Sequence, residues 1–113
     1  MGVVRLSEVA LAVVAGTAEP EELLSVLQGS VVFCEAPETP GVMTVKTPEG
    51  PLVPVFSSLA ELATARGAVA WFSTTGLDLL DLLPAGHDLL LDPAGPVPLR
   101  LRTASLRRVV HVS

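Results

Sequence analysis

Few side chains in this chain could do chemistry, and its two histidines come first. A Ser or Cys nucleophile needs a base beside it and an acid that orients the base, and the bases that the sequence offers are His87 and His111. His87 stands beside Asp88 just before an apolar run, where a solvated turn histidine is the simpler interpretation. His111 lies near the end of the sequence, where chains fray. We therefore predict no catalytic residue and expect that the protein is not an enzyme.

A second candidate is the pair of carboxylates at Asp78 and Asp81, which lie about one helical turn apart. Neighbouring carboxylates can raise the pKa of one member, as acid–base chemistry requires. The leucines around them favour instead the solvent face of a helix. Thr74, Thr75 and Gly76 precede that helix and could bind an anion through backbone N–H groups. The Lys and the glycine spacing of a phosphate loop are missing, which makes this signal weak.

The single cysteine, Cys34, limits the metal and redox chemistry of the chain. One cysteine permits no intrachain disulfide, and one Cys with two His cannot supply a structural zinc site. Because Cys34 lies between Phe33 and Glu35 in an apolar run, it is expected to be a small core residue. We predict no metal and no cofactor.

The charges are unevenly distributed. The chain has 7 basic and 12 acidic residues and a net charge of −5, which argues against nucleic-acid binding. Residues 100–113 nevertheless carry no acid and four arginines: Arg100, Arg102, Arg107 and Arg108. The favoured interpretation is an edge strand whose charges prevent aggregation. An anion-binding patch is the second interpretation. A contact between this basic segment and the acidic body, within one chain or across a homodimer, is the third.

Trp71 and Phe72 supply a further candidate for a contact with a partner. Trp71 and Phe72 are neighbours in an apolar run, so in a strand they point to opposite faces of the sheet. One of the two is expected in the core, and the other is covered by a helix or available to a partner. The predicted interaction surface therefore contains Trp71 together with the four arginines of residues 100–113.

The hydropathy of the chain favours a folded domain in the cytoplasm. Half of the residues are hydrophobic, which excludes a disordered chain. The longest stretch without a charge, residues 23–34, is too short to span a bilayer. Glu8 interrupts the apolar residues near the N-terminus, which favours a helix over a signal peptide. We expect no membrane contact and one domain over residues 1–113.

The elements that would position these residues follow from periodicity and turn chemistry. Helices are predicted over residues 4–15, from a Thr17 cap to Gly29, from a Ser58 cap to Arg66, and from Thr74 or Thr75 to Leu83. Strands are predicted over residues 31–35, 42–46, 52–56, 68–73, 89–91 and 97–102. Pro51 and Pro54 place the third strand at an edge or make it short, whereas the apolar residues 68–73 suit a central strand.

The order of these elements predicts an α+β fold: a single domain with a mixed or antiparallel sheet packed against helices. Residues 103–113 stay ambiguous, because Thr103 could cap a short helix while Val109, Val110 and Val112 favour a strand. A frayed tail is the remaining alternative.

Two segments carry a resemblance to a known family. Residues 53–58, Val-Pro-Val-Phe-Ser-Ser, lead into a helix, and residues 89–96, Leu-Leu-Leu-Asp-Pro-Ala-Gly-Pro, end a strand. Together they resemble SseB-like N-terminal domains, and the order of elements fits over nearly the whole chain. The resemblance implies that Pro54, Phe56, Ser57 and Ser58, with Asp92 and Pro93, are fold-defining positions: a buried anchor, a helix cap and a turn.

The chain departs from the family at Asp92, where the family usually has Asn before Pro. Either residue can make an Asx-type turn, so the fold stays the same, but a ligand contact by the Asn amide would be lost. The family is associated by name with enhanced serine sensitivity and with type III secretion. Its molecular role is largely undefined, and no catalytic residue comes with the resemblance.

The function that these observations favour is a non-enzymatic protein–protein interaction or regulatory module. A related version is an acidic protein that neutralises a basic partner. The alternative is a small-molecule sensor or a small enzyme with a pocket near Thr74, Thr75, His87 and Asp88.

Overall fold

The computed structural model describes residues 6–95 and 98–102. Arg107, Arg108, His111 and the ambiguous segment 103–113 lie outside the described residues. The helices are α1 (Leu6–Ala15), α2 (Pro20–Gly29), α3 (Leu59–Arg66) and α4 (Gly76–Leu82). The strands are β1 (Val31–Glu35), β2 (Val45–Thr47), β3 (Gly50–Val55), β4 (Trp71–Thr75), β5 (Asp88–Leu91) and β6 (Leu99–Leu101).

Within the described residues the strands form two sheets. β1 and β4 pair antiparallel, and the second sheet has the strand order β2-β3-β5-β6. β3 and β5 run parallel, whereas β2 and β6 pair antiparallel with their neighbours. The two sheets meet at Phe33 and Phe56, where each backbone N–H donates to the other residue's carbonyl oxygen at 2.8 Å. The mixed sheet and its helices confirm the predicted α+β class.

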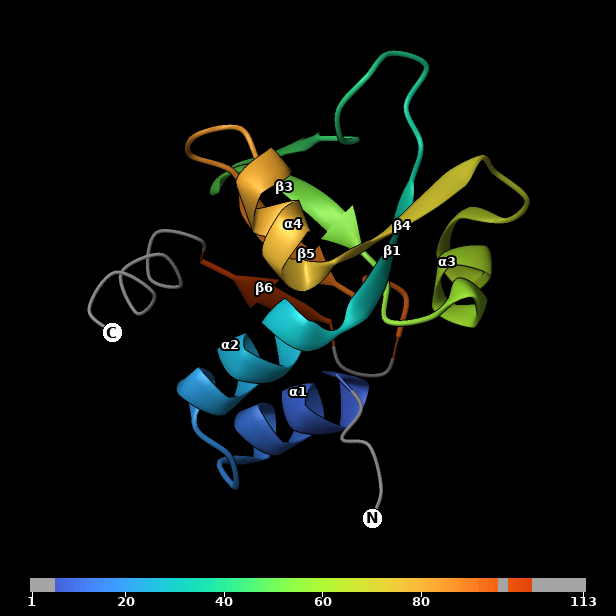
Figure 1. Cartoon of the computed structure of the whole chain (residues 1–113). Helices are drawn as coiled ribbons and strands as arrows, with labels where there is room; N and C mark the ends of the chain where they lie inside the picture. The colour runs from blue at the N-terminus through green and yellow to red at the C-terminus, as the bar shows by residue number, and fades with distance from the viewer. Residues whose placement is uncertain (1–5, 96–97, 103–113) are drawn as a thin grey trace.

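The core lies between the four-stranded sheet and the helices, with α4 over β3 and β5 and with α1 and α2 beside it (Figure 1). Alternate residues of β3 and β5 point into the core and are at most 1% exposed: Val53, Val55, Leu89 and Leu91. Leu27 of α2 and Leu79 of α4 are fully buried, and burial of such a side chain contributes about 1.5–3 kcal/mol. The α2–α4 contact requires glycine at position 76, because a Cβ there would stand 1.8 Å from the Leu27 carbonyl oxygen.

Two helices begin at a side chain that accepts a hydrogen bond from a backbone N–H three residues further along the chain. The Ser58 hydroxyl accepts from the Glu61 N–H at 3.1 Å, which confirms the predicted cap. The Thr75 hydroxyl accepts from the Asp78 N–H at 3.2 Å, so of the two predicted starts of α4, Thr74 or Thr75, the second is the cap. The prediction for Thr17 was wrong, because Glu19 occupies the N-cap of α2. Thr17 instead donates its N–H and its hydroxyl to the Ala12 carbonyl oxygen and so closes the end of α1.

β3 differs from its prediction, since it lies inside the sheet between β2 and β5 despite its prolines. Phe56 turns its backbone groups toward β1, and residues two apart on a strand face the same way. The missing N–H of Pro54 therefore falls in the gap between Leu52, where pairing with β2 ends, and Phe56. Pro51 faces the other side, one residue before pairing with β5 begins. Neither proline interrupts a ladder hydrogen bond.

β2 and β4 also differ from prediction. β2 begins at Val45, because residues 42–44 belong to the loop before it. The expected central strand over residues 68–73 is β4, Trp71–Thr75, which in the described part of the chain pairs only with β1. Residues 68–70 connect it to α3, which ends at Gly67 with φ 73°. Residues 68–73 are mostly apolar, yet Trp71 and Ser73 are exposed. The composition of this segment therefore suggested more burial than the structure shows.

Candidate functional site

The two motifs of the family resemblance meet at one junction. The Ser57 backbone N–H and hydroxyl donate to the two carboxylate oxygens of Asp92, at 2.8 and 2.7 Å. Asp92 is 6% exposed and its own N–H donates to the Val55 carbonyl oxygen at 2.9 Å. Phe56 is 1% exposed, as expected of an anchor. The carboxylate therefore ties the end of β5 to the segment between β3 and α3.

The expectation of an Asx-type turn at Asp92 is replaced by this longer-range contact. The turn is closed by backbone groups, with the Gly95 N–H donating to the Asp92 carbonyl oxygen at 2.9 Å. Asp92 has a φ of 49°, which Asp and Asn tolerate better than most residues. An Asn could hold the same junction, because its oxygen can accept from the Ser57 N–H while its amide donates to the Ser57 hydroxyl oxygen. Both oxygens of Asp92 are thus engaged within the fold.

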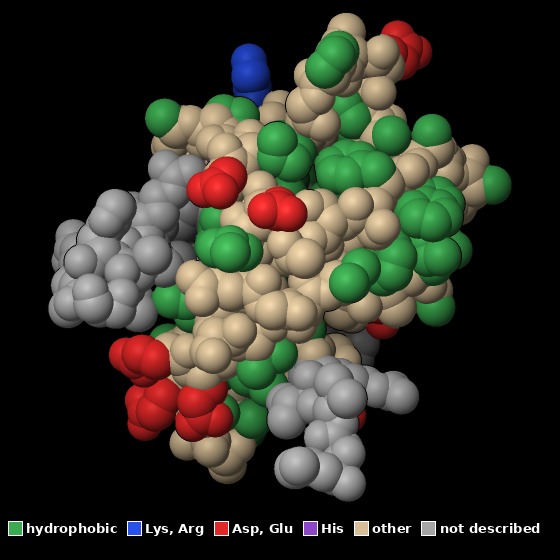
Figure 2. Space-filling view, viewed as in Figure 1, with side chains coloured by type: hydrophobic (Ala, Val, Ile, Leu, Met, Phe, Trp, Pro, Cys, Tyr) green, Lys and Arg blue, Asp and Glu red, His purple; other side chains and the backbone are tan. Residues whose placement is uncertain are grey.

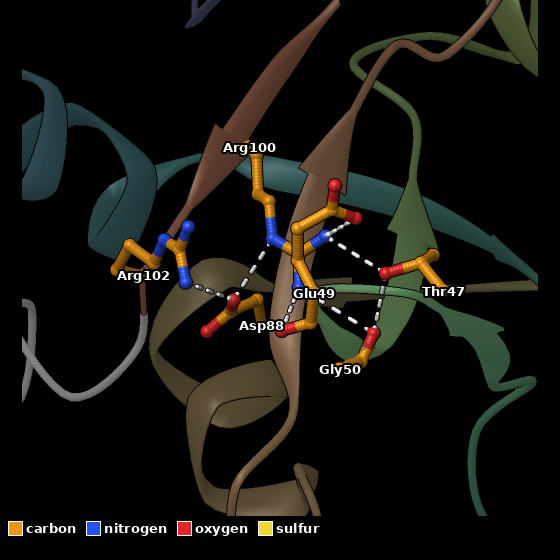
Figure 3. A network of polar contacts seen from close by, with 6 residues as sticks. All are labelled: Thr47, Glu49, Gly50, Asp88, Arg100 and Arg102. Carbon is orange, nitrogen blue, oxygen red and sulfur yellow. Dashed lines mark hydrogen bonds and ion pairs between the residues drawn. The ribbon is translucent and has the colours of Figure 1, made fainter.

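Arg100 is engaged by its own chain. Figure 3 shows its guanidinium between the β2–β3 turn and β5, with Arg102 on the other side of the same carboxylate. Arg100 Nε donates to Asp88 Oδ2 at 2.9 Å, and Nη1 donates to Thr47 Oγ1 at 3.1 Å. Its side chain is 21% exposed and Asp88 is 14% exposed. β6 is an edge strand of the described sheet, as predicted. Its Arg100 contacts an acidic residue of the same chain, Asp88.

Arg102 keeps most of its surface in solvent. Its Nη1 lies 3.7 Å from Asp88 Oδ2, and its side chain is 61% exposed. Arg102, which directly follows β6, therefore has greater exposure than Arg100 for contact with an external anion.

Three of the four residues of the predicted small-molecule pocket have identified contacts within the chain. Thr75 caps α4 and Asp88 pairs with Arg100, as described above, while His87 Nδ1 lies 3.1 Å from the Ala85 carbonyl oxygen. Thr74 lies on β4, in the other sheet from Asp88. Three cavities on the described part of the chain are lined by other residues.

Those cavities are open depressions elsewhere on the surface. One of about 670 Å³ lies between α1, α2 and the Ser57–Ser58 segment. Another, of about 400 Å³, lies over the outer face of the four-stranded sheet and includes Pro54 and Pro93 of the family motifs. At its rim Arg66 Nε donates to Glu35 Oε1 at 2.6 Å, and this carboxylate raises the pKa of Arg66 above its usual range. The third, of about 480 Å³, is lined by α3, the α3–β4 connection and Trp71.

Trp71 is exposed on the outer side of the β1–β4 sheet. It is 47% exposed and meets Phe33 edge to face, with ring centroids 5.9 Å apart. Val31, at the other end of β1, is 56% exposed. Phe72 points the opposite way and packs against the core, which confirms the predicted division of the two aromatic residues. We call the side chains on this outer side the Trp71 face: Val31, Phe33 and Glu35 of β1, with Trp71, Ser73 and Thr75 of β4.

The surface near the Trp71 face is more apolar than the surface over α4 and the start of α2. Figure 2 shows hydrophobic side chains gathered over α3 and the start of β4, and acidic side chains over α4 and the start of α2. Asp78 and Asp81 are exposed on α4, which agrees with the solvent-face interpretation of that pair. The sequence alone could not identify the Trp71 face as uncovered, because that depends on where the helices pack.

The described residues contain no group of three or more His, Cys, Asp and Glu side chains placed to hold a metal ion. Cys34 is buried, and desolvation raises the pKa of its thiol to about 11, which confirms the core role. In the same described residues no helix is long and apolar enough to cross a membrane.

In the residues described, the chain forms an α+β fold whose two strand-end motifs are joined by the contact between Ser57 and Asp92. The chain matches the SseB protein N-terminal domain family over residues 6–108 and belongs to that family. No curated protein and no solved structure matches the chain.

Proposed function

We propose that this protein is a non-enzymatic interaction module, and that it binds a protein partner through the Trp71 face. The observation that carries the proposal is the 47% exposure of Trp71 on a sheet face. Trp is enriched among the residues that dominate binding energy, because it buries a large area while retaining few rotamers. Exposed apolar side chains that cluster, as Trp71 and Val31 do with Phe33 between them, mark contact surfaces more often than single exposed residues do.

The chemistry of the face indicates the chemistry of the partner. The Trp71 face has one charged side chain, Glu35, whose carboxylate is paired with Arg66 at 2.6 Å. The depression beside Trp71 is apolar and is lined by Leu59, Leu62, Ala63, Ala68 and Val69 with Gly67. An aromatic or branched aliphatic side chain of the partner fits such a lining. Because the contact is apolar, we expect binding that persists at high salt.

The arginines contribute less to the proposed binding surface than the sequence suggested. Arg100 donates to Asp88 and Thr47, so of the two predicted arginines that the structure describes, Arg102 is the one that can contribute more. A cytoplasmic location fits a chain whose one cysteine is a free, buried thiol. A regulatory role would follow if the partner's activity changes on binding.

The test is capture of a partner by tagged protein at low and high salt, with two matched variants. Trp71→Ala removes the exposed indole, and Leu82→Ala removes a side chain of similar exposure, 51%, from α4. After identification by mass spectrometry, the partner is purified and titrated calorimetrically. We expect Trp71→Ala to weaken binding by about 30-fold or more and Leu82→Ala to leave it unchanged. Equal affinity for wild type and Trp71→Ala would refute the assignment of the face.

A further inference from the structure

The edges of the two sheets differ in their protection against strand pairing. Native proteins protect edges with short strands, charges and prolines. β2 and β6, the edges of the described four-stranded sheet, are three residues long. β2 carries Lys46, and β6 carries Arg100 with Pro98 just before it. β4 has five residues, Trp-Phe-Ser-Thr-Thr, with no charge and no proline, so it lacks each of these devices.

The hydrogen bonds around β4 show which backbone groups its free edge presents. The Ala36 N–H donates to the Ala70 carbonyl oxygen at 2.8 Å, and the Gly76 N–H donates to the Ser30 carbonyl oxygen at 2.9 Å. These two pairs flank the β1–β4 register. Because backbone groups alternate along a strand, the even residues of β4 face β1, and the odd residues turn outward.

The outward residues of β4 are Trp71, Ser73 and Thr75. The opposite alternation in β1 agrees, since the odd residue Phe33 bonds to Phe56 on the far side of β1. In the part of the chain that the structure describes, β4 has no strand partner other than β1, and Ser73 at its centre is exposed. In Figure 1, β4 lies at the side of the molecule away from β6.

We infer that β4 pairs antiparallel with β4 of a second copy of this chain, around a twofold axis at Ser73. The strand is self-complementary in this arrangement: Ser73 exchanges both of its hydrogen bonds with Ser73 of the second copy, and Trp71 stands opposite Thr75 of that copy. The outward residues share one parity, so the central Ser73 pair is a hydrogen-bonded pair, while Thr75, whose carbonyl oxygen begins the α4 ladder, offers its N–H to the Trp71 carbonyl oxygen. A small serine at the axis lets the two backbones approach.

Charge favours a second copy at this edge over the rest of the surface. The chain has a net charge of −5, so most surfaces of two copies repel each other. β4 contributes no charge to such a contact. Pairing also leaves the two Trp71 faces on the same side of one continuous sheet, which doubles the surface available to the partner proposed above. The inference goes beyond the proposed function and does not depend on it.

The test is sedimentation of the purified chain over a range of concentrations, with two matched variants. Ser73→Lys places like charges opposite each other at the axis, and Ser25→Lys makes the same change at an exposed position of α2. We expect the mass of two chains for wild type and for Ser25→Lys at high concentration, and association at least about tenfold weaker for Ser73→Lys. Wild type that stays monomeric, or Ser73→Lys that dimerises like wild type, would overturn the inference.

Amide hydrogen exchange gives a second measurement that does not need a variant. The Ser73 N–H faces outward, whereas the Phe72 and Thr74 N–H groups face β1. We expect exchange at Ser73 to slow as concentration rises, while exchange at Phe72 and Thr74 is slow throughout. Exchange at Ser73 that is independent of concentration would count against β4 pairing even if a dimer forms. A monomer that still captures a partner through Trp71 would overturn this inference alone.

Discussion

Replacement of Asp92 by Ala tests the junction that holds the family motifs together. The substitution removes both acceptors of the Ser57 N–H and hydroxyl, at 2.8 and 2.7 Å. Hydrogen bonds to a charged group contribute about 1.5–3 kcal/mol each, and Ser57 is only half-buried, so water can replace part of the loss. Ala at a φ of 49° adds about 1 kcal/mol of strain. We expect Asp92→Ala to lower the free energy of unfolding by about 3–5 kcal/mol.

Two further variants measure separately what the Ser57 hydroxyl and the charge of Asp92 contribute to stability. Ser57→Ala removes the hydroxyl but keeps the backbone bond, so we expect a loss of about 1–2 kcal/mol. Asp92→Asn keeps an acceptor for the N–H, gains a donor for the hydroxyl oxygen and tolerates the positive φ. We expect it to lie within about 1 kcal/mol of wild type.

The measurement is urea unfolding followed by Trp71 fluorescence and by circular dichroism, with coincident transitions as the check for two-state behaviour. A loss of 3 kcal/mol in a domain of this size corresponds to a melting temperature about 12–15 °C lower. The reasoning fails if Asp92→Ala is no more destabilising than Asp92→Asn. It also fails if Ser57→Ala costs as much as Asp92→Ala, because the backbone bond would then contribute nothing.

Three further substitutions test other parts of the fold. Gly76→Ala should destabilise the protein by about 3 kcal/mol or more in urea unfolding, because its Cβ would meet backbone of α2 at 1.8 Å. Gly29→Ala, with nothing within 4 Å, is its control and should be neutral or stabilising by up to about 1 kcal/mol. Arg100→Ala leaves the half-buried Asp88 carboxylate without its nearest cation and should cost about 2 kcal/mol, of which Arg100→Lys should recover less than half. Burial raises the pKa of Cys34 to about 11, so its contribution to stability is present below about pH 9 and lost as pH rises toward 11, by up to about 3 kcal/mol. Cys34→Ala should remove this part of the pH dependence, and an unchanged profile would contradict the assignment.

Features set by neighbours in the chain were predictable, and features set by distant contacts were not. Both side-chain caps, Ser58 on α3 and Thr75 on α4, need only a residue three positions on, and both were predicted, Thr75 as one of two possible starts. The alternation of Trp71 and Phe72 is equally local. The position of β3 inside its sheet depends on a parallel partner that follows two helices and another strand, so proline count alone misplaced it.

The candidate site shows the same division. The link between Ser57 and Asp92 joins residues 35 positions apart, and neither neighbourhood signals its partner. Arg100 was expected to point its charge outward because β6 alternates in sequence. Its face of the sheet also holds Asp88 and Thr47, which only the strand order brings together.

The motif residues of the SseB family explain how the fold is held together, but they do not indicate what the protein binds. The motif residues Phe56, Ser57 and Asp92 are buried or bonded to one another, so they have little left to offer a partner. The side chains and backbone groups with unspent binding capacity lie instead on β4 and on the outer side of β1. An apolar Trp at 47% exposure loses contact with water favourably when a partner covers it, and an uncharged edge offers backbone groups to a second strand. These two features are the physical basis of the two proposals made above.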